Sequence, residues 1–272
     1  MIFVTGDLHG NADNDMKKLT SVKWAYGTTL TKQDYLICCG DFGLAYWDDE
    51  EEIYWRQWLN NKPWTTLFCD GNHENFDRLK SLPTRDMFGG YVGQVSDSIF
   101  HLRRGEVYTI DGGVHGLQKF FVFGGASSYD KAWRVNDMAE YERKHKHPPV
   151  IKKWYPQEIP SGEEIENGYE NLSRHDWDVD VVISHTGPHS DIPDFIPSFY
   201  DNEERMSRIF DPVAFMLQDF KDKLTFRAWV FGHFHQTKSI GKLHCLYNNV
   251  VSLEDILAAS PQQYQSAFGE IL

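Results

Sequence analysis

Five apolar segments of strand character each stop at residues that can bind metal ions. The segments are residues 2–5, 35–39, 66–70, 179–184 and 228–231. The side chains at or just beyond their ends are Asp7, His9, Asp41, Asn72, His73, His185, His233 and His235. Because ligands of α/β proteins collect beyond the carboxyl ends of the strands, we expect these side chains to meet in one crevice. A set this rich in oxygen and nitrogen donors is large enough for two metal ions.

The residue types indicate hydrolytic metal chemistry. Carboxylate, amide and imidazole groups suit hard divalent ions, and Asp41 is the natural bridge because one carboxylate can bind two ions with its two oxygens. Two ions about 3.5–4 Å apart can hold a shared hydroxide and clamp the attacking and leaving oxygens of an in-line displacement. His73 differs in kind, because it directly follows Asn72 and would point to the opposite side of an extended segment. An imidazole titrates in a range that suits protonation of a leaving alkoxide.

The elements that would position these residues follow an α/β pattern. Helices are expected at 15–22, 48–60, 74–81 and 202–224. Strands and helices alternate in the first third of the chain, which predicts a largely parallel sheet. Further short strands are expected at 91–95, 99–102, 107–110 and 119–123, and a hairpin pair at 242–247 and 250–253. The close spacing in the middle of the chain predicts antiparallel hairpins.

Residues 126–177 interrupt that pattern. The segment is polar and rich in Lys, Glu, Pro and Trp, with helices expected at 137–147 and 162–175 on either side of Pro148-Pro149. We expect a single domain over residues 1–272 that carries this segment as a helical insert or lid. Arg134 lies in the insert and is a candidate phosphate clamp, because a guanidinium binds phosphate with two hydrogen bonds.

Composition narrows the class of protein. The 272 residues are 41% hydrophobic and 25% charged, as in a folded soluble protein. The formal net charge of −13 makes nucleic acid an unlikely partner and disfavours an anionic lipid surface. No segment approaches the roughly 18–20 apolar residues of a membrane span, and we expect a cytoplasmic location. The cysteines are Cys38, Cys39, Cys69 and Cys245, and we expect them to be free, since three lie in apolar strand segments.

Taken together, the motif blocks resemble a known superfamily. The blocks are Gly6-Asp7-Leu8-His9-Gly10-Asn11, Gly40-Asp41, Gly71-Asn72-His73-Glu74, His185 and Gly232-His233-Phe234-His235. In this order and spacing they resemble the calcineurin-like metallophosphoesterases, and Asn11 is more like the bacterial and phage-type members. The resemblance implies a four-layer α/β/β/α sandwich of two mixed sheets flanked by helices, with metals at one edge.

The resemblance also implies roles for the residues. With Asp41 as the bridge, the ligands of one ion would be completed by Asp7, His9 and His235. The ligands of the other ion would be completed by Asn72, His185 and His233. The matching histidine of the family, here His73, lies beside the substrate as general acid or transition-state stabiliser.

The expected activity is metal-dependent hydrolysis of a phosphoester by a metal-bridging hydroxide. The substrate is open between a phosphodiester, a nucleotide and a phosphomonoester. Mn²⁺ is the expected metal, and Fe or Zn²⁺ also fits because no thiolate is among the ligands. A non-catalytic interaction scaffold and a nuclease on the same fold are the alternatives.

One block departs from the Ser/Thr protein phosphatases. Those enzymes continue the second block as Gly-Asp-x-Val-Asp-Arg-Gly, whereas this chain has Leu44 and Ala45 where the acidic residue and the arginine would stand. The sequence therefore disfavours protein phosphatase activity.

Overall fold

The structure, a computed structural model, describes residues 1–113, 116–149 and 151–258, with the backbone alone at residues 11–13. Residues 259–272 of the expected single domain lie outside the described part. Within it, no helix is both long and apolar enough to cross a bilayer.

The first sheet has seven strands in the order β13-β1-β2-β3-β6-β5-β4. Four neighbours run parallel: β1 (Ile2–Thr5), β2 (Tyr35–Cys39), β3 (Thr65–Cys69) and β6 (Ile99–Leu102). Antiparallel pairing adds β13 (Val251–Ser252), β5 (Gly90–Ser96) and β4 (Thr84–Met87). The strands with predicted ligands are therefore central and parallel, so their carboxyl ends share one edge.

The second sheet has six strands in the order β11-β12-β10-β9-β8-β7. Its parallel centre is β12 (Leu243–Cys245), β10 (Ala228–Phe231), β9 (Val181–Ser184) and β8 (Leu117–Phe123). The antiparallel edges are β11 (Lys238–Ile240) and β7 (Val107–Asp111). Here too the strands that precede predicted ligands, β9 and β10, are adjacent.

Successive side chains of each central strand enter different apolar cores, as the two-residue period of a strand requires. In β3, Leu67 belongs to the core between the sheets, while Phe68 belongs to the core on the outer face of the first sheet. In β9, Ile183 faces the other sheet and Val182 packs in the outer core of the second sheet. Both sheets are therefore covered on two sides.

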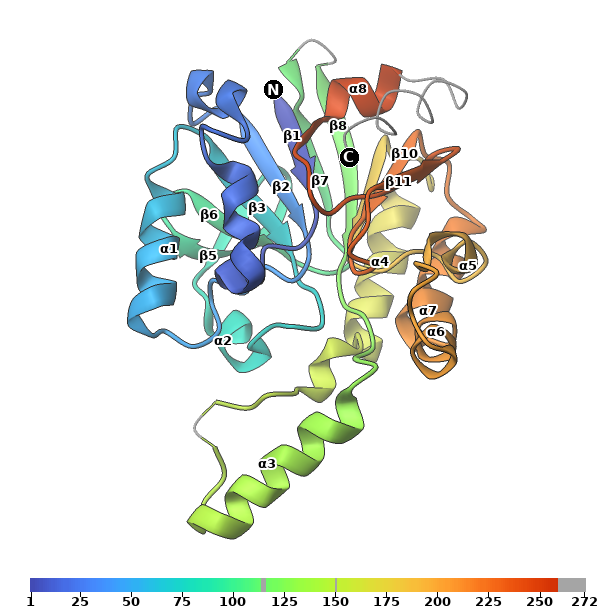
Figure 1. The fold of residues 1–272 in the computed structure, drawn as a ribbon. Coiled ribbons are helices and arrows are strands. Elements are labelled where there is room, and N and C mark those ends of the chain that lie inside the picture. Colours follow the sequence, from blue (N-terminus) through green and yellow to red (C-terminus); the bar gives the residue numbers. More distant parts are fainter. Residues whose placement is uncertain (114–115, 150, 259–272) are drawn as a thin grey trace.

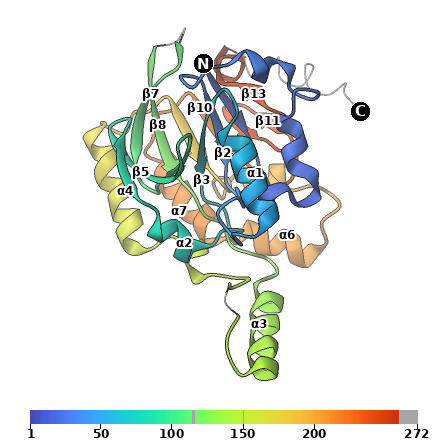
Figure 2. The same cartoon turned by 90° about the vertical axis from the view of Figure 1, so that its left-hand side faces the viewer.

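Helices form the two outer layers (Figures 1 and 2). On the first sheet these are η1 (His9–Leu19), η2 (Ala25–Thr29), α1 (Glu50–Asn60) and α2 (Phe76–Ser81). On the second they are α4 (Gly162–Arg174), α5 (Ile192–Phe195), α6 (Asn202–Ile209) and α7 (Pro212–Lys221). The expected α/β/β/α sandwich is confirmed. The short α8 (Leu253–Ala258) follows β13 and contacts β1.

One helix stands apart from these layers. The helix α3 (Lys131–His145) has no buried residue and projects from the sandwich in both views (Figures 1 and 2). We call residues 131–154 the arm. By contrast, α4 in the second half of the 126–177 segment packs Leu172 into the outer core of the second sheet. The short η4 (Pro156–Glu158) links the arm to α4.

Two expectations about the last third of the chain were wrong. The helix expected at 202–224 is two helices, because Asp211 caps α7 through the Val213 N–H, and Pro212 has no N–H to continue α6. The strands expected to pair at 242–253 join different sheets, since β12 pairs with β10 and β13 with β1. Near the N-terminus, the helix expected at 15–22 is a 3₁₀ helix that begins already at His9.

Candidate active site

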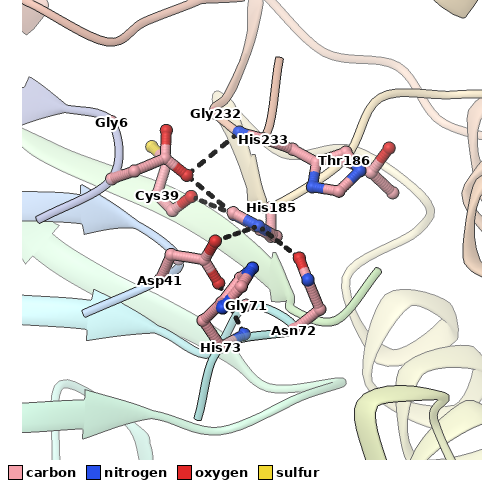
Figure 3. Close-up of polar contacts among 12 residues, drawn as sticks. Gly6, Cys39, Asp41, Gly71, Asn72, His73, His185, Thr186, Gly232 and His233 are labelled. Carbon is pink, nitrogen blue, oxygen red and sulfur yellow. Dashed lines mark hydrogen bonds and ion pairs between the residues drawn. The ribbon is translucent and has the colours of Figure 1, made fainter. Parts of the chain in front are cut away.

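The structure brings the predicted ligands together at the shared strand edge, and Figure 3 shows Asp41, Asn72, His185 and His233 among them. Asp7 follows β1, Asp41 follows β2, and Asn72 follows β3. From the second sheet, His185 follows β9, and His233 and His235 follow β10. Distant parts of the chain thus place two carboxylates and several imidazoles in one largely buried crevice.

Asp41 lies between imidazoles on two sides. Its Oδ2 atom is 3.2 Å from Nε2 of His9 and 3.3 Å from Nε2 of His185. Nε2 of His185 is also 3.2 Å from Oδ1 of Asn72. The Nδ1–H of His185 donates to the Cys39 carbonyl at 2.9 Å, which directs the other ring nitrogen towards the crevice.

Two groups of side chains have metal-ligand spacing. The first is Asp7, His9 and His235, and the second is Asp7, Asp41 and His185, with all candidate ligand atoms of each group within 4.8 Å of one another. Both groups share Asp7. Its buried Oδ2 atom has no hydrogen-bond partner among the described residues. A buried carboxylate oxygen without a partner is costly, so a cation suits this position.

Charge in the crevice couples the two sheets. Burial lowers the pKa of His185, but the carboxylates of Asp41 and Asp7 outweigh burial and raise it to about 9. Burial likewise raises the pKa of Asp41, yet His185 and His73 hold it well below its ordinary value. The carboxylates of Asp7 and Asp41 therefore favour positive charge at this point of the crevice, which a cation could also supply.

The backbone at this edge is strained where the ligand candidates stand. His9, Asp41, His233 and His235 all have positive φ angles, between 44° and 67°. Residues other than glycine rarely adopt φ angles in this range, and such backbone strain concentrates at functional sites. Gly40 and Gly71 allow the close packing, since a Cβ atom at either would lie 2.1 Å from His185 Nδ1 or Asp41 Oδ1.

His73 points to the same crevice without belonging to either group of ligands. Its backbone N–H donates to Asp41 Oδ1 at 2.8 Å. Arg134 reaches it from the arm, with Nη2 3.1 Å from His73 Nδ1. Burial, Arg134 and His9 lower the pKa of His73 to about 4, against the opposing effect of Asp41. The predicted phosphate clamp thus lies directly against the predicted catalytic histidine.

His233 lies less centrally than the other candidates. Its ring is 4.9 Å from that of His185, but it falls outside both groups with ligand spacing. The buried Arg208 on α6 donates to its Nε2 atom at 3.0 Å and to its carbonyl at 3.1 Å. Nothing in the sequence signalled Arg208, because α6 comes near β10 only in the folded chain.

Other residues that sequence reasoning missed orient the ligand candidates. Asp15 accepts from Nδ1 of His9 at 2.7 Å, which turns Nε2 towards Asp41. Lys18 is buried, and its ammonium donates to the Gly6 carbonyl beside Asp7 at 3.2 Å. Their place in η1, just after the first motif block, was the available signal.

A hydrogen-bond chain fixes the Asn72 amide from the opposite side. Asn72 Nδ2 donates to Ser128 Oγ at 3.1 Å, and the Ser128 hydroxyl donates to the buried Glu158 carboxylate at 2.5 Å. The chain leaves Oδ1 of Asn72 facing His185. Ser128 lies in the loop after β8, and Glu158 lies in η4, just beyond the arm.

Two carboxylates brace the loops behind the crevice. Glu74, the last residue of the third motif block, accepts from the Phe42 N–H at 2.7 Å, and burial with the nearby Asp41 raises its pKa to about 8. Asp70, at the end of β3, pairs with the buried Arg104 at 2.8 Å. Leu44 and Ala45 are fully buried in the outer core of the first sheet, so neither supplies an acidic or cationic group to the crevice.

Comparison with known proteins agrees with this architecture. Residues 1–237 match the calcineurin-like phosphoesterase family. The chain therefore belongs to this family of metallophosphoesterases. It is also 24% identical over 254 residues to a lariat debranching enzyme of Arabidopsis thaliana, over 86% of this chain and 54% of the relative. The chain thus spans about half the length of that relative. The expectation that nucleic acid is an unlikely partner gains no support from this similarity.

Proposed function

We propose that the protein hydrolyses a phosphoester with two divalent transition-metal ions at the shared strand edge. One ion would be held by Asp7, His9, Asp41 and His235, and the other by Asp41, Asn72, His185 and His233. The observation that carries the proposal is the buried Asp7 carboxylate, whose Oδ2 atom lacks a partner among the described residues while His9 and His235 lie at ligand spacing. Membership of the phosphoesterase family supports the reaction class.

The donor set suits Mn²⁺, Fe or Zn²⁺. Oxygen and imidazole nitrogen ligands are compatible with all three, and we propose Mn²⁺ first. Burial raises the pKa of all four cysteine thiols, so they stay neutral and are poor metal ligands.

The chain's own residues would then share the work around the phosphoryl group. When bound, the cations polarise the phosphoryl oxygens and lower the pKa of a water molecule so that it can attack near neutral pH. His73, with its pKa near 4, is neutral at pH 7 and donates a hydrogen bond to a phosphoryl or leaving oxygen. The fixed positive charge beside it comes from Arg134, whose Nε is held by Asp130 at 2.8 Å. Of the two roles that the family offers for His73, this environment favours transition-state stabilisation.

Metal reconstitution tests the proposal. Protein stripped of metal should be inactive towards bis(p-nitrophenyl) phosphate, and Mn²⁺ should restore turnover with two ions bound per chain. Asp41→Asn should lower turnover by about 10³-fold or more, since this carboxylate would hold both ions. Full activity of this variant, or one ion per chain in active protein, would refute the dinuclear arrangement.

His73→Ala separates ligation from catalysis. The variant should bind two ions as the unchanged protein does, while kcat falls by about 10²–10³-fold because one oxyanion donor is lost. Metal content measured on the same sample decides the role. Loss of an ion would make His73 a ligand.

A substrate panel distinguishes the remaining readings. Phosphodiesters, nucleotides and phosphomonoesters should be compared at equal metal loading. Debranching of a lariat is a second candidate, which rests on the name of the Arabidopsis relative. Protein that binds two ions but turns over no member of the panel would instead act as an interaction scaffold.

We also propose a cytoplasmic location, which cell fractionation would test.

A further inference from the structure

A cavity of about 490 Å³ opens beside the proposed metal centre. His9 and His73 line it, so it is continuous with the crevice that would hold the reacting phosphate. The rest of its wall comes from Gly10 of η1, the segment between β2 and α1, the first turn of α1, and the arm. A group attached to the reacting phosphate can therefore extend into this cavity.

Two indole rings line the cavity while remaining open to solvent. Trp47, in the loop after β2, is 48% exposed, and Trp133, in the first turn of α3, is 62% exposed. Tryptophan is usually well buried, so two such side chains on one cavity offer accessible aromatic surface. Because they come from separate elements, the cavity presents aromatic surface on both its body side and its arm side.

The charges around the indoles differ between the two walls. The arm contributes Arg134 and Lys153, and the Lys153 ammonium lies 5.7 Å from the centre of the Trp133 ring. The α1 side contributes the exposed carboxylates of Asp49 and Glu51. Cations suit a phosphate, and carboxylates accept hydrogen bonds from amino groups of a heterocycle. The same carboxylates repel a long polyanion, so charge favours a short ligand.

We propose that this cavity binds the nucleobase of a short phosphodiester, with the base stacked on Trp47 and Trp133. The proposal rests on the proposed phosphoester hydrolysis and names its substrate class. Aromatic stacking is tolerant of base identity, because every base presents a flat aromatic face. The cavity would therefore select for the presence of a base more than for its sequence.

Matched substrates separate this inference from the activity itself. A dinucleotide and its abasic analogue, with the same phosphodiester linkage, should be hydrolysed by protein loaded with Mn²⁺. Trp47→Ala and Trp133→Ala should each raise KM for the dinucleotide by about 5- to 150-fold and leave kcat and the abasic analogue unchanged. Trp→Phe at either position should restore much of the loss.

The control variant is Tyr54→Ala. Tyr54 is 58% exposed on α1 but does not line the cavity, so its replacement should leave KM and kcat for both substrates unchanged. Titration calorimetry with adenosine monophosphate should show the same order of affinities as KM. This binding measurement also reports on the two indoles without turnover.

Three results would overturn the inference. If the unchanged protein hydrolyses both substrates equally and the tryptophan variants match it, hydrolysis stands and the base subsite falls. If neither substrate is hydrolysed and adenosine monophosphate does not bind, the proposed function and the subsite both fail. A longer oligonucleotide hydrolysed at higher kcat/KM than the dinucleotide would overturn the assignment to a short ligand.

Discussion

The strand edge and the arm differ in how their functional residues are held. At the edge, Asp7 and His185 are fully buried and extend from strands that are hydrogen-bonded on both sides. In the arm, α3 buries none of its residues and is held by a few polar contacts. The difference indicates a division of labour. Precise metal chemistry needs ligands on rigid elements, whereas contacts to the rest of a substrate can lie on a segment with few restraints.

The two regions meet through a small number of side chains. Arg134 crosses from the arm to His73, and Tyr46 in the body donates to the Lys152 carbonyl at 2.7 Å. Just beyond the arm, Glu158 accepts a hydrogen bond from the Ser128 hydroxyl, and Ser128 in turn accepts one from the Asn72 amide. A change on the arm can therefore reach the strand edge through Arg134.

The largest expected effect concerns the rigidity of the body. Arg104 is buried and pairs with Asp70 at the end of β3, and it also donates to the Gln157 carbonyl at 3.0 Å. Arg104→Ala leaves the buried Asp70 carboxylate without its arginine, with His101 left beside it at 3.1 Å, and should lower the free energy of unfolding by about 3–5 kcal/mol. Urea denaturation measures this change. Arg85→Ala, at an exposed arginine on β4, is the control. Equal losses of unfolding free energy in both variants would contradict the view that buried pairs such as Arg104 and Asp70 hold the body rigid.

A second test of the body uses pH. His244 on β12 is buried, and burial lowers its pKa to about 4. In the unfolded chain this imidazole takes up a proton near pH 6.5, whereas in the folded chain it does so only near pH 4. Its contribution to the free energy of unfolding is therefore fully present above pH 6.5, and up to about 3 kcal/mol is lost as the pH falls towards 4. The free energy of unfolding should therefore fall less steeply with acid in His244→Gln. His145→Gln, at an exposed histidine of the arm, should follow the unchanged protein, and the same slope in all three would refute the assignment.

Arg134→Ala tests the contact from the arm to the catalytic side. Loss of a charged donor beside His73 should lower kcat/KM for a phosphodiester by about 10- to 100-fold, which corresponds to about 1.5–3 kcal/mol. The free energy of unfolding should not change, since α3 has no buried residue. Arg143→Ala on the same helix is the control, because Arg143 is largely exposed and does not line the cavity. Unaltered kinetics in Arg134→Ala would refute the role of Arg134 as a phosphate clamp.

An effect of the same size as that of Arg134→Ala, but on metal affinity, is expected when the Ser128 chain is broken. Ser128→Ala removes the acceptor that orients the Asn72 amide and should weaken Mn²⁺ binding by about 10- to 100-fold, the usual range for a partner that orients a ligand. Titration calorimetry with the metal-stripped protein measures the affinity. Ser127→Ala is the control, because Ser127 contacts Asp211 through its backbone N–H. Equal affinities in both variants would show that the orientation of Asn72 does not depend on Ser128.

Much of the site was predictable because it is encoded locally. Strand character before Asp7, Asp41, Asn72 and His233 follows from short apolar runs, and parallel pairing within each sheet brings the strand ends to one edge of that sheet. The break at Asp211-Pro212 was equally local and could have been read from the missing proline N–H. The pairing of residues 242–253 could not, because short strands carry no mark of the sheet they join.

The sequence by itself determined the series of ligand candidates and the alternation of strands and helices, since strand periodicity and strand-end turns depend on neighbouring residues. The four-layer sandwich was expected from the resemblance of the motif blocks to a known superfamily. Only the tertiary structure decided which side chains surround the ligand candidates. Arg134 against His73, Arg208 against His233 and Ser128 against Asn72 each join residues at least 25 positions apart. Such contacts depend on how whole layers and the arm pack. No local pattern encodes that packing, so the folded chain was needed to find them.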